Sequence, residues 1–320
     1  MTPRKILIPV DFSYHANSAI RQGMALANRW NSEAVAVHVD PLPGAATLAV
    51  EPIVIPPHLF AGLHAEHDAA IDSSLDEIRA DMAELADPGI TVDVRSWRGE
   101  SVAGIIDCAR ELSADFLVMG SQGASGLAHL MLGSTAEQVS RAAPCPVLIA
   151  GRADDSRETA RPLRRVLAGI DYSPLSPSVA RQAAQLVEPG GVVELVHIVN
   201  EAQISALGAT LGSSHQDLQT LLADLNKGRV AQLEVFAKEH AELFARTEVL
   251  LYIGVGTAAA QLLKRAEDTS ADLIVVGSHQ RAGLGERVIG TVADRVLRYA
   301  PVPVVLCPAA ALPDAATSAQ

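Results

Sequence analysis

The sequence repeats itself: most stretches of the first half recur in the second, in the same order and about 160 residues later. KILIPVDFSYHANSAI from Lys5 corresponds to RVLAGIDYSPLSPSVA from Arg165, and ADFLVMGS from Ala114 corresponds to ADLIVVGS from Ala271. A third pair, GSTAEQVSRAAPCPVLIA and GTVADRVLRYAPVPVVLC, closes the two halves. A repeat of this length predicts two domains of the same fold rather than one large domain.

The repeat also places the domain boundaries. Residues 1–150 and 164–308 are the two expected domains, and 309–320 form a tail. Between the domains, residues 151–163 read GRADDSRETARPL, a polar and charged stretch that is typical of a linker.

Each half alternates short apolar runs with amphipathic stretches, which predicts parallel strands covered by helices on both faces. In the first half the expected strands are Lys5–Val10, Ala34–Val39, Thr91–Arg95, Asp115–Met119 and Pro146–Ala150. The expected helices are Ala16–Arg29, Ile71–Leu85 and Val102–Leu112. Right-handed crossovers then give an α/β fold with two tandem, open, doubly wound five-stranded parallel sheets of the Rossmann-like type.

One segment, Pro41–Asp68, is interpreted as an insertion after the second strand, and the equivalent stretch after Asn200 has a different sequence. Its four leading prolines argue against a long element, and its apolar residues predict packing on the other half or on a second copy. It contains His58, His64 and His67, which leave a zinc site open, although a solvated polar stretch is the plainer interpretation.

Composition excludes several classes of partner. The net charge of −12 and the 3% of aromatic residues argue against nucleic-acid binding. No run approaches the roughly 20 apolar residues of a membrane span, and no signal peptide is recognised at the start. The three cysteines are far apart, which predicts reduced, buried thiols in a cytoplasmic protein.

Two loops at strand ends are the candidate binding elements. The first carries Asp11, and the second contains Gly120 and Gly123 and leads into the helix that starts near Gly133–Ser134. In open α/β sheets, ligands bind beyond the carboxyl ends of strands where the strand order reverses. Glycines let the backbone approach a ligand, and free amides at a helix start favour an anion such as phosphate.

The spacing Gly120-x2-Gly123-x9-Gly133-Ser134 resembles the ATP-binding signature of the universal stress protein family. The stretches ILIPVDFS, HV, ADFLVMGS and APCPVLI support the resemblance, which covers both halves and so points to a tandem member. In that family the adenosine lies against the ends of the first two strands and the phosphates on the glycine loop and the next helix. The resemblance implies an ATP site, with or without Mg²⁺, formed by Pro9, Val10, Asp11, Val39, Met119, Gly120, Gly123, Gly133, Ser134, Thr135 and Ala136.

The second half departs from this pattern. Gln280 stands in place of the second loop glycine, and Gly169 replaces the proline that corresponds to Pro9. We therefore expect a weaker second site or none. Its residues would be Gly169, Ile170, Asp171, Ile198, Val276, Gly277, Gly290, Thr291 and Val292.

Some of these residues have structural alternatives. Asp11 and Ser13 are typical helix caps, and Ser134–Glu137 fits a capping box, so Ser134 is expected to cap its helix as well as contact the nucleotide. His38 and His197 end apolar strands and are interpreted as packed histidines rather than catalytic bases.

The leading functional hypothesis is a nucleotide-dependent sensor or regulator of the stress response, in which ATP orders the loop from Ser121 to Leu132 for an unknown protein partner. The sequence has no nucleophile elbow and no acid–base pair, so binding without turnover is expected. A slow ATP hydrolase or phosphotransferase and a ligand-free interaction module remain the alternatives. The apolar final strand of each half predicts an intramolecular pseudo-dimer, and a homodimer of chains stays open.

Overall fold

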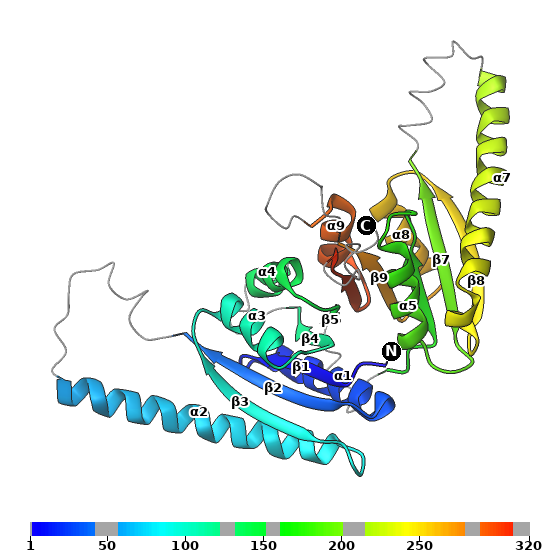
Figure 1. The fold of residues 1–320 in the computed structure, drawn as a ribbon. Coiled ribbons are helices and arrows are strands. Elements are labelled where there is room, and N and C mark those ends of the chain that lie inside the picture. Colours follow the sequence, from blue (N-terminus) through cyan, green and yellow to red (C-terminus); the bar gives the residue numbers. More distant parts are fainter. Residues whose placement is uncertain are drawn as a thin grey trace, which may run out of the picture. The chain divides into compact units, whose positions relative to one another are not determined.

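The computed structural model describes residues 2–41, 57–121, 132–151, 161–200, 215–278 and 289–309, with only the backbone for 14–15, 57–65 and 215–226. The chain divides into two compact units, Met1–Ala160 and Arg161–Gln320, whose division lies inside the expected linker. Each unit is an α/β domain with a parallel sheet, as the sequence predicts (Figure 1).

The first unit follows the expected alternation of strands and helices. Its strands are β1 (Lys5–Val10), β2 (Glu33–Asp40), β3 (Val92–Arg98), β4 (Phe116–Gly120) and β5 (Val147–Ala150). Its helices are α1 (Tyr14–Trp30), α2 (Pro57–Leu85), α3 (Ser101–Glu111) and α4 (Ser134–Ala142). Helices α1 and α2 pack together on one face of the sheet, and α3 and α4 pack together on the other.

Strand order in the first unit is β3-β2-β1-β4-β5, with every described pairing parallel. The order therefore reverses between β1 and β4, where Ile6 pairs with Phe116 and Leu7 with Leu117. The side chains of β1 are buried on both faces, which explains its uninterrupted apolar run. This reversal places the carboxyl ends of β1 and β4 side by side.

Helix α2 corrects one expectation. The sequence predicts a helix only from Ile71, whereas α2 already begins at Pro57 and runs through the second part of the insertion. A proline suits the first turn of a helix because its missing N–H would have no intrahelical partner there. The leading prolines Pro41 to Pro56 precede the helix instead of breaking it. Residues 42–56 lie outside the described part of the chain.

The second unit repeats the arrangement with the strand order β8-β7-β6-β9-β10. Its strands are β6 (Arg165–Gly169), β7 (Val192–Val199), β8 (Glu248–Val255), β9 (Leu273–Gly277) and β10 (Val304–Cys307). Its helices are α5 (Ser176–Leu186), α7 (His215–Glu239), α8 (Ala258–Asp268) and α9 (Thr291–Tyr299), with a short 3₁₀ helix, η2 (Ala241–Phe244). The expected meeting of the two final strands, β5 and β10, and the homodimer stay predictions.

One difference between the cores of the two units lies on strand β7. In the second unit Glu194 on β7 is fully buried, and its Oε1 accepts a hydrogen bond of 2.7 Å from Nε of Arg265. Its Oε2 lies 3.3 Å from the guanidinium of Arg165. By the sheet register and the repeat, the first unit has Val35 and Cys108 at the positions of Glu194 and Arg265. The second core therefore contains a buried ion cluster where the first is apolar.

Candidate functional site

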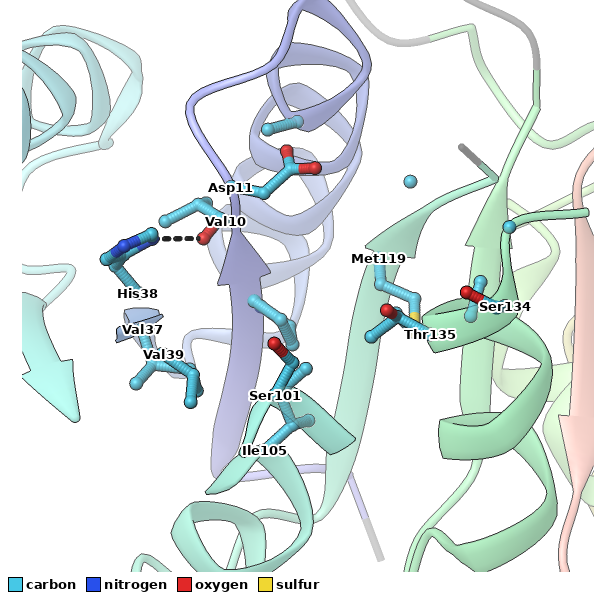
Figure 2. Close-up of a pocket in the computed structure, with 15 residues that line it drawn as sticks. Val10, Asp11, Val37, His38, Val39, Ser101, Ile105, Met119, Ser134 and Thr135 are labelled. Atoms are coloured by element: carbon cyan, nitrogen blue, oxygen red, sulfur yellow. Dashed lines mark hydrogen bonds between the residues drawn. The ribbon is translucent and has the colours of Figure 1, made fainter. Parts of the chain in front are cut away.

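A cavity of about 160 Å³ lies at the carboxyl ends of β1, β2 and β4 in the first unit, where the strand order reverses (Figure 2). It is lined by Pro9, Val10, Asp11, Ala16, Val37, His38, Val39, Ser101, Ile105, Met119, Gly120, Gly133, Ser134, Thr135 and Ala136. This set brings together every residue that the sequence assigns to the first site, except Gly123, which lies outside the described residues. The contact of these residues with a nucleotide stays a prediction.

The first wall is the turn from β1 into α1. Asp11 Oδ1 accepts hydrogen bonds from the backbone N–H of Ser13 at 3.1 Å and from its hydroxyl at 2.5 Å. The N-cap of α1 is Ser13, whose Oγ accepts from the N–H of Ala16 at 3.3 Å. Asp11 therefore fixes the cap without being the cap itself, and it remains a residue of the cavity wall. Phe12, between them, has a left-handed backbone with φ of 58°.

The second wall is held by a histidine. His38 Nδ1 lies 2.9 Å from the carbonyl oxygen of Val10. Because a carbonyl oxygen only accepts, this ring nitrogen carries the proton. The ring of Phe12 packs on His38 with 4.1 Å between the centroids. His38 thus ties the end of β2 to the end of β1, in keeping with a packing role, but it also lines the cavity (Figure 2).

The third wall is the start of α4, where one expectation is wrong. The N-cap of α4 is Gly133 and Ser134 is the first helical residue, so the predicted capping box does not form. Glu137 instead pairs with Arg141 one turn later. Since glycine has no side chain to accept a hydrogen bond, no cap residue covers the first-turn amides, and these amides with the helix dipole favour an anion. The N–H of Gly133 also donates to the carbonyl oxygen of Ser121 at 2.8 Å, which joins the two ends of the glycine loop.

The remaining wall is apolar and comes partly from α3. Val39 and Ile105 are almost fully buried there. The sequence reasoning missed Ala16, Val37, His38, Ser101 and Ile105 as lining residues. Ser101 and Ile105 are four residues apart and therefore share one face of the helix, which the sequence pattern of α3 already indicates. The pattern does not indicate which end of the sheet this face covers.

The second unit repeats the strand-end turn with different partners. Asp171 Oδ1 accepts from the N–H of Ser173 at 2.9 Å and from the hydroxyl of Ser176 at 3.0 Å. Tyr172 repeats the left-handed backbone, with φ of 61°, and packs on His197. His197 Nδ1 lies 2.7 Å from the carbonyl oxygen of Ile170, as His38 does with Val10.

Side chains crowd the position in the second unit that corresponds to Pro9. A β-carbon on Gly169 would lie 3.3 Å from Cγ1 of Val276 and 3.6 Å from Cδ2 of Leu262. Val276 and Leu262 correspond to Met119 and Ile105 of the first unit and are nearly fully buried. The residues proposed for a second site lie at the ends of β6, β7 and β9 and at the start of α9: Gly169, Ile170, Asp171, Ile198, Val276, Gly277, Gly290, Thr291 and Val292. Gln280 lies outside the described residues.

The electrostatic surroundings of the second turn are also distinct. Burial lowers the pKa of His197, and the nearby charge of Arg229 lowers it further. The hydrogen bond to Ile170 and the charge of Asp171 raise this pKa, but burial has the largest effect. Burial raises the pKa of Tyr172, whose hydroxyl donates to the carbonyl oxygen of Arg229 at 3.3 Å. His197 is therefore favoured in its neutral form.

Of the three histidines that the insertion contains, only His67 has a described side chain, and those of His58 and His64 lie outside the description. His67 Nε2 lies 3.1 Å from Oδ1 of the buried Asp40, and Asp68 makes a two-oxygen ion pair with Arg98 at 2.9 Å. These pairs fasten α2 to the ends of β2 and β3. Among the described residues, no group of three metal-ligating side chains forms. The described helices also include none that is long and apolar enough to cross a membrane.

Comparisons with known proteins agree with this architecture. The model of the universal stress protein family matches residues 2–151 and again 162–308. A universal stress protein of Mycobacterium tuberculosis is 28% identical over 309 residues, which cover 95% of this chain and 98% of the relative. One of Mycolicibacterium smegmatis is 27% identical over 310 residues, covering 94% and 96%. The crystal structure of a universal stress protein from Archaeoglobus fulgidus covers 95% of this chain and 98% of that chain with 22% identity and a TM-score of 0.63, which shows a shared fold.

Proposed function

The chain belongs to the universal stress protein family, with one family domain in each unit, and from this premise we propose that its first unit binds an adenine nucleotide, ATP in the first place, as a regulatory signal. The observation that carries the proposal is the gathering of β1, β2, β4 and the α4 start around one cavity. Its walls differ in character: Val37, Val39 and Ile105 lie on the side of β2 and α3, and the hydroxyls of Ser134 and Thr135 lie on the side of α4 (Figure 2).

These walls suit the parts of a nucleotide. A planar base is the most apolar part and fits between Val39 and Ile105, whereas phosphates suit the N-terminus of α4. Asp11 lies between them with a carboxylate that can accept a hydrogen bond from a ribose hydroxyl or contact an accompanying Mg²⁺. The cavity is smaller than the roughly 300–1,000 Å³ of sites that enclose whole ligands, so we propose that the phosphate tail extends out of it past Gly120.

We propose that the second unit binds the nucleotide weakly or not at all. Val276 lies close enough to Gly169 for a β-carbon there to make a tight contact of 3.3 Å, and Val292 replaces the hydroxyl of Thr135 at the helix start. The second unit would then serve the first as a folded partner domain rather than as a second sensor.

Equilibrium dialysis of ATP against the full chain tests the binding proposal. We expect one ATP per chain, and the double variant Ser134→Ala with Thr135→Val should weaken binding at least about tenfold through the loss of two hydroxyl contacts. The matched control is Thr291→Ala, which removes the corresponding hydroxyl from the second unit and should leave the affinity unchanged. Two equivalent sites, or no bound ATP at millimolar nucleotide, would contradict the proposal.

Binding without turnover is part of the proposal. The described cavity wall contains Asp11 as its one carboxylate, and His38 is engaged with Val10. Steady release of ADP by the purified protein, lost in the Ser134→Ala, Thr135→Val variant, would instead establish a slow hydrolase.

A further inference from the structure

We propose that the hydroxyl of Ser101 contacts the base of the bound nucleotide, which makes the start of α3 the base-selecting wall of the cavity. This inference rests on the nucleotide site proposed above and assigns one of its specificity-determining residues.

Helix α3 does not use the hydroxyl of Ser101 for its own stability. The N-cap of α3 is Glu100, whose Oε2 accepts a hydrogen bond of 2.8 Å from the N–H of Ala103. Ser101 is the first helical residue, and its hydroxyl has no hydrogen-bond partner within the described ranges. A half-buried hydroxyl that lines a cavity without a partner is available to a ligand.

Helix α3 also approaches β2 closely. A β-carbon on Gly104 would lie 2.6 Å from Cγ1 of Val39 and 3.2 Å from Cδ1 of Trp97, so a larger residue would force the helix or Val39 to move. Ser101 and Ile105 lie three and one positions from Gly104 and both line the cavity. The glycine therefore lets α3 bring these two side chains to the apolar wall.

Ser101 and Ile105 come from α3 and line the cavity together with Val39 of β2, whereas Ser134 and Thr135 come from the start of α4 (Figure 2). A base held among apolar side chains still needs partners for the polar atoms on its edge. A serine hydroxyl both donates and accepts, so it can pair with an amino group or a ring nitrogen.

The second unit provides a natural comparison. By the β2–β3 and β7–β8 registers, Ala258, Gln261 and Leu262 stand in place of Ser101, Gly104 and Ile105. The two positions that correspond to Ser101 and Gly104 thus carry neither a hydroxyl nor a glycine, in the same unit where Leu262 lies near Gly169.

The test compares two variants and two probes on the full chain. Binding of ATP is measured directly, and binding of inorganic tripolyphosphate is measured by its competition with ATP. Ser101→Ala should weaken ATP binding about three- to tenfold and leave the tripolyphosphate constant unchanged, because only the base contact is lost. Ser134→Ala should weaken both probes, and Ser101→Thr, which keeps the hydroxyl, should restore ATP binding.

The possible outcomes separate this inference from the binding proposal. If the wild-type chain binds ATP and Ser101→Ala binds it equally well, the role of Ser101 is wrong and the binding proposal stands. If Ser101→Ala weakens ATP and tripolyphosphate alike, or Ser101→Thr fails to restore binding, the residue only shapes the helix and the inference is overturned. If the wild-type chain binds no ATP, both fall.

Discussion

The two units use one fold with different interiors and different strand-end sites. The first has an apolar core around Val35 and Cys108 and keeps a cavity at its strand ends, whereas the second buries Glu194 with Arg265 and brings Val276 toward Gly169. The strand order, the histidine bond and the left-handed turn residue are shared. The comparison teaches that features which define the turn between strand and helix are retained in both units, while the side chains that decide what fits beside that turn are not.

The largest expected effect concerns the buried ion cluster. Arg265→Leu leaves Glu194 buried with only the more distant Arg165, and we expect the free energy of unfolding of the second unit to fall by about 3–5 kcal/mol. The double variant Glu194→Val with Arg265→Leu should recover most of this loss because no charge stays buried without a partner.

Urea unfolding measures this effect unit by unit. Both tryptophans, Trp30 and Trp97, belong to the first unit, so tryptophan fluorescence follows that unit while circular dichroism follows both. The matched control is Cys108→Ala in the first unit, which should cost only about 1 kcal/mol. A cost for Arg265→Leu as small as that of the control would show that the two cores are equivalent.

The next effect is the response to ATP. At a concentration about 100 times the dissociation constant, ATP should stabilise the first unit by about 2.7 kcal/mol and leave the second unchanged. Hydrogen exchange of the full chain, resolved by peptide, should show slower exchange in β1, β4 and the start of α4 than without ATP. Equal protection of β6, β9 and the start of α9 would remove the proposed functional asymmetry.

A smaller difference is expected at the helix caps. Ser13→Ala removes a side-chain cap from α1 and should lower the unfolding free energy of the first unit by about 1 kcal/mol. The equivalent helix, α5, has Leu175 as its N-cap and no side-chain cap bond, so Ser173→Ala should cost less. Thermal unfolding of the two variants checks the ranking, and a reversed order would contradict it.

The smallest effect is a dependence on pH in the second unit. Because the pKa of His197 is lowered in the folded state, the unfolded chain takes up its proton first as the pH falls. The free energy of unfolding should be highest above about pH 6.5, the pKa of this histidine in the unfolded chain. It should decline as the pH drops from there toward the lower pKa of the folded state. His197→Gln should reduce this decline, as measured by urea midpoints at several pH values; an unchanged slope in the variant would assign it to other groups.

Much of the fold could be read from the sequence because its signals are local. The repeat set the number of domains, and runs such as that of β1 are apolar because both faces of a parallel strand are buried. The order of strands and helices in the first unit follows from these runs, with the ends of elements shifted by a few residues. The beginning of α2 was missed because the leading prolines of the insertion argued against a long element there, whereas they precede the helix and Pro57 stands in its first turn.

The candidate site was predictable in part. The sequence predicts Asp11 and the start of α4 as parts of the cavity wall, because glycines and polar residues at strand ends can be recognised within a few neighbouring residues. The assignment of the α4 cap to Ser134 was wrong by one residue, since the cap depends on where the backbone turns and not only on which residue can cap. Sequence alone could not place Ser101 and Val39 on the wall of one cavity, because the two residues belong to different segments that only packing brings together.

The sequence by itself determined the duplicated α/β architecture and the strand-end location of the site, because periodicity and turn chemistry act between neighbours in the chain. Tertiary structure decided which side chains meet: Glu194 and Arg265 are 71 positions apart, and Gly104 on α3 packs on Val39 of β2. Such pairs depend on sheet register and helix packing, which combine many weak contacts over the whole domain. For that reason the cavity of the first unit and the close approach of Val276 to Gly169 in the second became visible only in three dimensions.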